Sequence, residues 1–343
     1  MHIPDGYLSP TTCAVAYAAA APFWYHASRR IKEVLRSQAA PLIAMFAAFS
    51  FTIMMFNVPI PGGTTAHAIG ATLMAIVVGP WAAVAGVSTA LLLQALFFGD
   101  GGITAFGANS LNMAITAPLV GYAIYQLISG SDPSPRRRVV AAAIGSYVGI
   151  NAAALLAGLE LGIQPIFWSE GGRALYNPYG LEVTVPAMLL AHLTVAGFAE
   201  AAITALAVAY LLRTQPALLQ EGGGADARRL GKAGWSLVAV LAALVVLTPI
   251  GLLAPGGASF EWGAEELKGM VGYLPDGLGR LSEVWWLAPL RDYQLPGMGA
   301  EASFFQQASG YILSAVVGVA VIFAVVFAAR IVLVRRTSVA NQR

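Results

Sequence analysis

The first two residues and one later histidine are the groups in this sequence most able to bind a metal. Met1 carries an α-amine, and the backbone nitrogen and imidazole Nδ1 of His2 follow at a spacing that closes fused five- and six-membered chelate rings. With the backbone nitrogen deprotonated, these three nitrogens lie nearly in a plane, and the imidazole of His67 could complete a square. Tetragonal nitrogen coordination is diagnostic for Ni(II) or Cu(II), whereas Zn(II) prefers a tetrahedron and Mg(II) six oxygens.

A simpler interpretation of the same histidines stays open. A histidine near a helix end hydrogen-bonds more often than it ligates a metal, and a histidine at position 2 also arises by chance. Pro4, Asp5 and Gly6 favour the metal because they predict a turn that folds the terminus back into the protein. We expect the chain to keep Met1, since a cleavable signal peptide carries its positive charge before its apolar region and here the charge comes after.

The composition indicates a protein that is embedded in a lipid membrane. Hydrophobic residues make up 58% of the 343 residues and charged residues 10%, against about 25% charged in soluble proteins. Lipid requires backbone polar groups to pair within helices, so we predict an all-α, polytopic membrane helical bundle. The net charge of +2 comes without a clustered basic face, which argues against a nucleic-acid partner.

About nine apolar stretches could be embedded in the bilayer, which takes about 20 helical residues to cross. The third is short, and Gly79 and Pro80 predict a tight turn between it and the fourth, so these two could be partly re-entrant. The stretches are residues 10–27, 40–57, 66–79, 81–98, 109–129, 139–163, 184–213, 235–254 and 310–334.

Basic residues predict the orientation of this bundle. They follow the first, fifth, seventh and ninth stretches, and cytoplasmic loops carry an excess of Lys and Arg. The amino terminus should therefore lie outside and the carboxy terminus in the cytoplasm. The basic groups are Arg29, Arg30, Lys32 and Arg36; Arg136, Arg137 and Arg138; Arg213, Arg228, Arg229 and Lys232; and Arg335 and Arg336.

A Gly-rich, charged segment divides the chain into two units. Residues 215–234 have the composition of a flexible cytoplasmic linker. Residues 1–214 form the first unit, a metal-binding membrane domain if the terminal site is real. Residues 235–343 form the second, two helices around an outer loop of about 55 residues. A loop of this length is expected to have structure of its own.

Three long motifs resemble one known family. They are MHIPDGYLSP at the start, NVPIPGGTTAHAIGATLMAIVVGPWAAV from residue 57, and QALFFGDGGITAFGANSLNM from residue 94. They resemble the substrate-binding membrane components of energy-coupling-factor (ECF) nickel and cobalt transporters, the NikM/CbiM family, and the resemblance covers residues 1 to about 213. The second unit, with PDGL at residues 275–278, is similar to the small NikN component fused to it.

The resemblance implies a function and a ligand set. Its members hold the metal with the amine of the first residue, the amide and imidazole nitrogens of a second-position His, and a later imidazole, which here are Met1, His2 and His67. The implied role is capture of Ni(II), or alternatively Co(II), for import driven by ATP. The implied partners are a transmembrane coupling subunit of the NikQ/CbiQ type and a cytoplasmic ATPase of the NikO/CbiO type, in a prokaryotic inner or plasma membrane.

The sequence departs from the family pattern at a few positions. TTAH stands where the family commonly has TSGH, and PDGLG stands where it has PDGLE. The start MHIPDG, rather than the MHIMEG common in cobalt-pathway relatives, tilts the expected metal toward nickel.

Several further polar residues are candidates for holding the ligands in place. A ligating imidazole normally donates its other N–H to an oxygen. Asn109 could equally be a helix N-cap, and Asp100 could simply shape a turn. The candidates are Thr64, Thr65, Asp100, Asn109 and Asn112.

His192 and Glu200 form a possible polar pair inside the seventh stretch. They lie eight residues apart and thus on one helical face, and an intramembrane carboxylate is a functional hypothesis by default. Glu200 could serve as an ion relay or face a partner helix. Alternatively it pairs with Thr204, Asn151 or another polar group of the bundle.

Enzyme motifs are missing from the sequence. A phosphate loop around Lys232 would need Gly at 226 and Ser or Thr at 233, where Asp226 and Ala233 stand, so ATP hydrolysis is expected on a separate chain. No cofactor is expected either. Two rivals to a nickel transport subunit stay open: a non-catalytic structural membrane subunit without a metal site, and an intramembrane enzyme. A copper importer is a nearer alternative, because the same planar nitrogens suit Cu(II).

Overall fold

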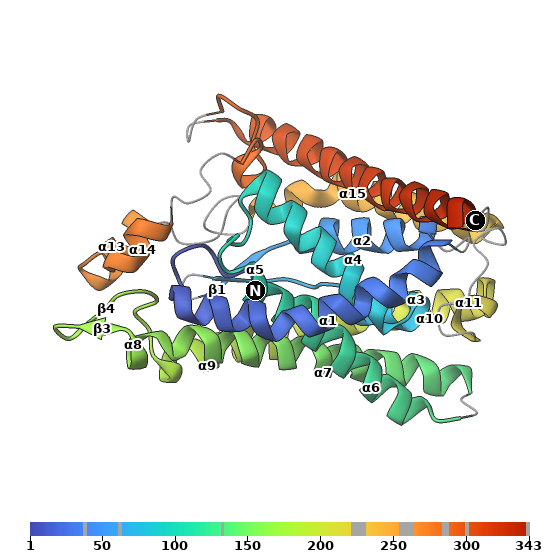
Figure 1. Ribbon diagram of the computed structural model, residues 1–343, viewed down its shortest axis with the longest axis horizontal. Helices are drawn as coiled ribbons and strands as arrows, with labels where there is room; N and C mark the ends of the chain where they lie inside the picture. Colours follow the sequence, from blue (N-terminus) through green and yellow to red (C-terminus); the bar gives the residue numbers. More distant parts are fainter. Residues whose placement is uncertain are drawn as a thin grey trace.

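Helices that run along the long axis of the molecule build most of the protein (Figure 1). The computed structural model describes residues 1–36, 40–60, 64–131, 134–220, 231–253, 264–282, 288–298 and 302–340. Half of the predicted linker, residues 221–230, lies outside the described residues. The mostly helical architecture confirms the predicted class of fold, a helical membrane bundle.

Six helical segments of the described residues are long and apolar enough to cross a membrane: Pro80–Phe98, Phe106–Ser129, Pro135–Phe167, Leu181–Thr214, Gly234–Leu253 and Phe304–Leu333. Three further helices occupy the first three predicted stretches: α1 (Pro10–Arg36), α2 (Ala40–Met54) and α3 (Ala71–Val78). The expected number of about nine embedded helices and the orientation of the termini stay predictions.

The third predicted stretch, residues 66–79, is helical only over Ala71–Val78, in keeping with its expected shortness. Residues Thr64–Ala66 form strand β2, and α3 has only eight residues, which rise about 12 Å and cannot cross a bilayer. β2 pairs antiparallel with β1 (Val58–Ile60), with Pro59 opposite Thr65. Gly79, at φ 92°, makes the expected turn, and α4 (Pro80–Leu93) begins directly after it.

Turns of π-helix interrupt the helices that border the amino-terminal segment. They are Gln94–Phe98 after α4, Ser110–Thr116 between α5 (Phe106–Asn109) and α6 (Ala117–Ser129), and His192–Ala196 between α9 (Leu181–Ala191) and α10 (Gly197–Thr214). Single π-helical turns are frequent at functional sites because they redirect side chains.

Small residues let the central helices pack closely. α7 (Pro135–Gly162) crosses α6 where Gly149 faces Gly121, and a Cβ on Gly149 would lie 3.0 Å from the Cα of Gly121. Close approach through glycine is the usual way for membrane helices to associate. α8 (Gln164–Phe167) and the hairpin of β3 (Ser169–Glu170) and β4 (Arg173–Ala174) follow α7.

The carboxy-terminal part packs along the first part rather than apart from it. Its elements are α11 (Ala217–Gln220), α12 (Gly231–Leu247), the 3₁₀ turn Thr248–Leu253, α13 (Ala264–Val271), α14 (Asp276–Leu281), the 3₁₀ turn Arg291–Tyr293, and α15 (Phe304–Ala340). The described residues between α12 and α15 therefore have structure of their own, as expected of this loop. α13 and α14 lie with the β3–β4 hairpin at one end of the molecule, and α11 and the carboxy terminus lie at the other (Figure 1).

Candidate metal centre

The first residues of the chain are buried inside the bundle. Met1 is 0% exposed and His2 1%. Two neighbours hold the residue that follows: both polar groups of the Asn109 side chain bind the backbone of Ile3, and the Gly102 N–H donates to the Ile3 carbonyl at 2.9 Å. Gly101, at φ +76°, lies close by, and a Cβ there would stand 3.1 Å from Cδ2 of His2. The segment is therefore closely fitted around His2.

The amine of Met1 lies against β2. It donates to the Thr65 carbonyl, and its nitrogen lies 3.2 Å from the Thr65 hydroxyl. β2 also leads directly into the segment that carries His67, because His67 is the first residue after it. The strand thus brings the amine and the second histidine to one place.

His2 and His67 face each other through one ring nitrogen each. Nε2 of His67 lies 3.1 Å from Nδ1 of His2, and His67 is 2% exposed. The other nitrogen of each ring faces an oxygen that can only accept: His67 Nδ1 the Ala68 carbonyl at 3.1 Å, and His2 Nε2 Gln94 Oε1 at 3.3 Å. In the tautomers that donate both of these hydrogen bonds, the facing nitrogens carry the lone pairs with which imidazoles ligate a metal.

Asp100 brings negative charge to the same point. Its Oδ1 lies 3.2 Å from Nδ1 of His2, and its Oδ2 accepts from the hydroxyl of Tyr293. Gln94 Nε2 donates to the Tyr293 hydroxyl at 3.1 Å and lies 3.4 Å from Asp100 Oδ2. Nδ1 of His2 therefore lies within 3.2 Å of both Nε2 of His67 and a carboxylate oxygen.

The environment favours neutral ligands and a protonated phenol. Burial lowers the pKa of His2 below its ordinary value, against the opposing charge of Asp100. Burial, with the Asp100 charge next, raises the pKa of Tyr293 well above its ordinary value. His2 is thus neutral at pH 7, the state that metal binding requires, and Tyr293 keeps the proton that it donates to Asp100.

The structure brings together some of the residues predicted to support the ligands and not others. Thr65, Asp100 and Asn109 lie at the histidine pair. Asn109 is no N-cap, because α5 begins three residues earlier and Asn109 has helical φ and ψ angles. Asn112 lies elsewhere and donates to Glu160 at 2.7 Å. Thr64 is placed by its backbone alone, opposite Ile60 in the β1–β2 hairpin.

His192 and Glu200 have separate partners rather than each other. Nδ1 of His192 donates to the Met188 carbonyl at 2.7 Å, within its own helix. Glu200 accepts from the backbone N–H groups of Ile69 and Gly70. The suggested alternatives for Glu200, Thr204 and Asn151, do not bind its carboxylate in the described part of the chain.

Sequence reasoning missed Gln94 and Tyr293. An amide in the apolar helix that ends QALFF was a usable signal, since buried amides need partners. Tyr293 gave no such signal among the many tyrosines of the chain. Asp292 and Tyr293 both have left-handed backbone, at φ 56° and 59°, and strain of this kind collects at functional positions.

Side-chain geometry alone does not mark this place as a metal site. The described residues contain no group of three His, Cys, Asp or Glu side chains arranged to hold a metal ion. The proposed donor set contains only two such side chains and depends on two backbone nitrogens for the rest.

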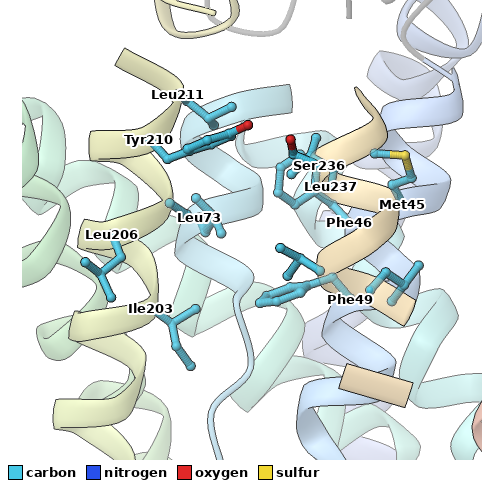
Figure 2. Close-up of a pocket in the computed structure, with 13 residues that line it drawn as sticks. Met45, Phe46, Phe49, Leu73, Ile203, Leu206, Tyr210, Leu211, Ser236 and Leu237 are labelled. Atoms are coloured by element: carbon cyan, nitrogen blue, oxygen red, sulfur yellow. The ribbon is translucent and has the colours of Figure 1, made fainter. Parts of the chain in front are cut away.

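A separate apolar cavity lies between α10, α2 and α12 (Figure 2). Its volume is about 370 Å³, and Ile203, Leu206 and Tyr210 of α10 line one wall. Phe46 and Phe49 of α2 and Leu237 of α12 line the opposite side. The two histidines of the candidate centre do not line this cavity.

Comparisons with known proteins agree with the two-part organisation of the chain. A family described as the cobalt uptake substrate-specific transmembrane region matches residues 2–218, and the PDGLE domain matches residues 233–335. The fused nickel transport protein NikMN of Rhodobacter capsulatus is 52% identical over 94% of this chain and 95% of its own. The probable fused nickel transport protein LarMN of Lactiplantibacillus plantarum is 44% identical over 93% and 94%.

A solved structure resembles the first part of the molecule. The crystal structure of a truncated transition metal transporter is 57% identical and superposes with a TM-score of 0.60, covering 62% of this chain and 99% of its own. With the family match and six helices able to cross a bilayer, the chain belongs to the cobalt uptake substrate-specific transmembrane family and is a multi-pass membrane protein of nickel or cobalt transport.

Proposed function

We propose that this protein captures Ni(II) as the substrate-specific subunit of an ATP-driven importer of the ECF type. The donor set is the Met1 amine, the deprotonated amide and Nδ1 of His2, and Nε2 of His67. The observation that carries the proposal is the 3.1 Å approach of Nδ1 of His2 to Nε2 of His67 beside the buried amine. Metal–nitrogen bonds of about 2.0–2.1 Å would separate neighbouring corners of a square by about 2.9 Å.

The flanking contacts support the same donor set. Gln94 and the Ala68 carbonyl take the N–H of each imidazole, so both rings are held in the tautomer that ligation needs. Asp100 supplies a negative charge that offsets part of the charge of a divalent cation. Two relatives whose names specify nickel support Ni(II) over Co(II), and the cobalt description of the family keeps Co(II) as the alternative.

The partners and the division of labour belong to the same proposal. The metal is bound by residues 1–214. Residues 215–234 link this part to residues 235–343, whose outer loop helps to load or hold the metal. The sequence carries no phosphate loop at Lys232, so a cytoplasmic ATPase and a transmembrane coupling subunit would supply the energy. Release then requires protonation of the nitrogen ligands or withdrawal of the terminus.

One titration tests the donor set. Purified full-length protein is compared with a version that carries one Gly before Met1 and with His67→Ala, after mass spectrometry has established which residue begins each chain. Native protein should bind one Ni(II) with the visible band of a square-planar complex, and both variants should lose that band. The added Gly moves the amine and destroys the ring sizes while both imidazoles remain, so equal binding by all three proteins would place the metal elsewhere.

A parallel titration with Co(II) tests the choice of metal. Nitrogen ligands bind Ni(II) more tightly than Co(II) in the usual order of divalent metals. Weaker Co(II) binding at the same site supports the nickel assignment, and tighter Co(II) binding would favour the alternative.

A further inference from the structure

The carboxylate of Glu200 joins a membrane helix to the segment that carries His67. Oε2 accepts from the N–H of Ile69 at 2.7 Å and from that of Gly70 at 2.9 Å, and Oε1 lies 3.0 Å from the Gly70 nitrogen. Glu200 is 2% exposed. Because both oxygens take part, the side chain holds two successive backbone groups from a helix 130 residues further along the chain.

The segment held in this way has little other support. Residues 67–70 lie between β2 and α3 in no regular structure. Gly70 is the N-cap residue of α3, and it has no side chain to cap the helix. The Ser50 hydroxyl donates to the Ile69 carbonyl at 2.7 Å. Glu200 thus acts as an external cap, placing negative charge at a helix start, where it is favourable.

The sequence explains why the hydrogen-bond acceptor for Ile69 and Gly70 comes from a distant helix. Gly70 has φ +71°, and a Cβ there would lie 2.5 Å from the ring of Phe49. This position therefore disfavours the side chains that would usually cap a helix. The π-helical turn His192–Ala196 immediately precedes α10, and Glu200 stands in the first turn of α10.

We propose that Glu200 is the positioning residue of the metal centre, fixing the backbone after His67 so that Nε2 of His67 stays aimed at Nδ1 of His2. The inference rests on the proposed donor set. Ligands must be held within about 0.5 Å of their working geometry, and residues that support ligands change metal affinity by about 10- to 100-fold when they are lost.

The same hydrogen bonds make α10 a connection from the metal centre to the far end of the bundle. One to three turns beyond Glu200, the side chains of Ile203, Leu206 and Tyr210 face the apolar cavity rather than a packed neighbour (Figure 2). Phe49, whose ring lies against Gly70, borders the same cavity.

Matched variants of the full-length protein test the positioning role. Glu200→Ala removes both acceptors, and Glu200→Gln keeps one carbonyl oxygen at nearly the same shape. Thr204→Val is the control: Thr204 lies one turn away on α10, is 0% exposed, and its hydroxyl has no hydrogen-bond partner among the described residues. Each protein is titrated with Ni(II) while the visible band is recorded, and amide hydrogen exchange is measured without metal.

The Ni(II) affinity is expected to differ among the three variants. Glu200→Ala should bind Ni(II) about 10- to 100-fold more weakly, with a shifted band at saturation and faster exchange at Ile69 and Gly70. Glu200→Gln should fall between it and the native protein, and Thr204→Val should match the native protein. If Glu200→Ala does not fold, the Ni(II) affinity and visible band of Glu200→Gln test the positioning role on their own.

Two results would overturn the inference. One leaves the proposed donor set intact, and the other rejects the donor set as well. Native affinity and band in the foldable Glu200 variants, with Ni(II) still lost on addition of Gly before Met1, would reject the positioning role alone. Native binding by the Gly-extended protein and by His67→Ala would reject the donor set, and the positioning role with it.

Discussion

Asn109 holds Ile3 through both of its polar groups. Its Oδ1 accepts from the Ile3 N–H at 2.8 Å, and its Nδ2 donates to the Ile3 carbonyl at 3.0 Å. Asn109 is 2% exposed and Ile3 0%. The residue directly after His2 is therefore fixed in the manner of a strand pair, by a side chain from the helix that begins at Phe106.

We expect Asn109→Leu to weaken Ni(II) binding by about 10- to 100-fold, because the chelating residues lose their anchor. Asn109→Asp, which keeps the acceptor and loses the donor, should weaken it less. The measurement is the Ni(II) titration of the full-length protein.

Asn112→Leu is the control for this prediction, three residues along the same helix. It leaves the buried Glu160 without the bond from Asn112 Nδ2, so it should lower the free energy of unfolding by about 1–3 kcal/mol and leave the Ni(II) band unchanged. Loss of the band in Asn112→Leu but not in Asn109→Leu would mean that the two roles are reversed.

Tyr293→Phe should weaken Ni(II) binding while the protein stays folded. The change removes the hydroxyl that donates to Asp100 and accepts from Gln94, two groups that contact His2, and loss of such supporting groups changes metal affinity by about 10- to 100-fold. The ring would still stack on Phe98, at 4.9 Å between centroids. Titration of the apo protein with Ni(II) measures the effect.

Tyr273→Phe provides the comparison, because the Tyr273 hydroxyl accepts from the Ala174 N–H at the outer end of the molecule. Its Ni(II) affinity should equal that of the native protein. Equal affinity in both variants would show that the carboxy-terminal unit does not act on the metal centre through Tyr293.

Gly6→Ala should loosen the outer loop from the amino-terminal segment. Gly6 has φ +89°, and a Cβ there would lie 2.9 Å from the Leu278 carbonyl and from its side chain. Left-handed backbone costs a residue with a side chain about 1–2 kcal/mol, and the collision with the PDGL motif adds to this. The thermal midpoint of the full-length protein should fall.

Gly171→Ala separates the cost of the left-handed backbone from the cost of the collision with Leu278. Gly171 has φ +58°, but a Cβ there would meet nothing within 4 Å, so only the backbone cost remains. The fall in midpoint should therefore be larger for Gly6→Ala, and an equal fall in both would indicate that the contact with Leu278 contributes nothing.

Periodic and apolar features of the chain were predictable from the sequence. Helices form where long apolar runs occur, because lipid leaves the backbone no other way to satisfy its polar groups. Gly79 and Pro80 marked their turn by conformational preference alone. The helix α3 begins five residues after the start of the predicted stretch, and the pairing of Thr65 with Pro59 depends on a hairpin partner that composition does not reveal.

Contacts between distant residues could not be predicted in the same way. His2 and His67 were paired by their chemistry, since few other nitrogens could complete a square. Glu200 was singled out as a buried charge, but its partners are backbone groups, which look alike at every position of a sequence. Tyr293 reaches Asp100 across 193 residues, and only the folded outer loop brings them together.

The depth of the metal centre bears on how fast an ion could enter or leave it. Met1, His2 and His67 are between 0% and 2% exposed, so neither water nor a competing chelator can reach the donors while the segment stays in place. Under the proposed function, the residence time of an ion would be set by how often the amino-terminal segment opens. The concentration of a chelator outside would then have little effect on the rate of release.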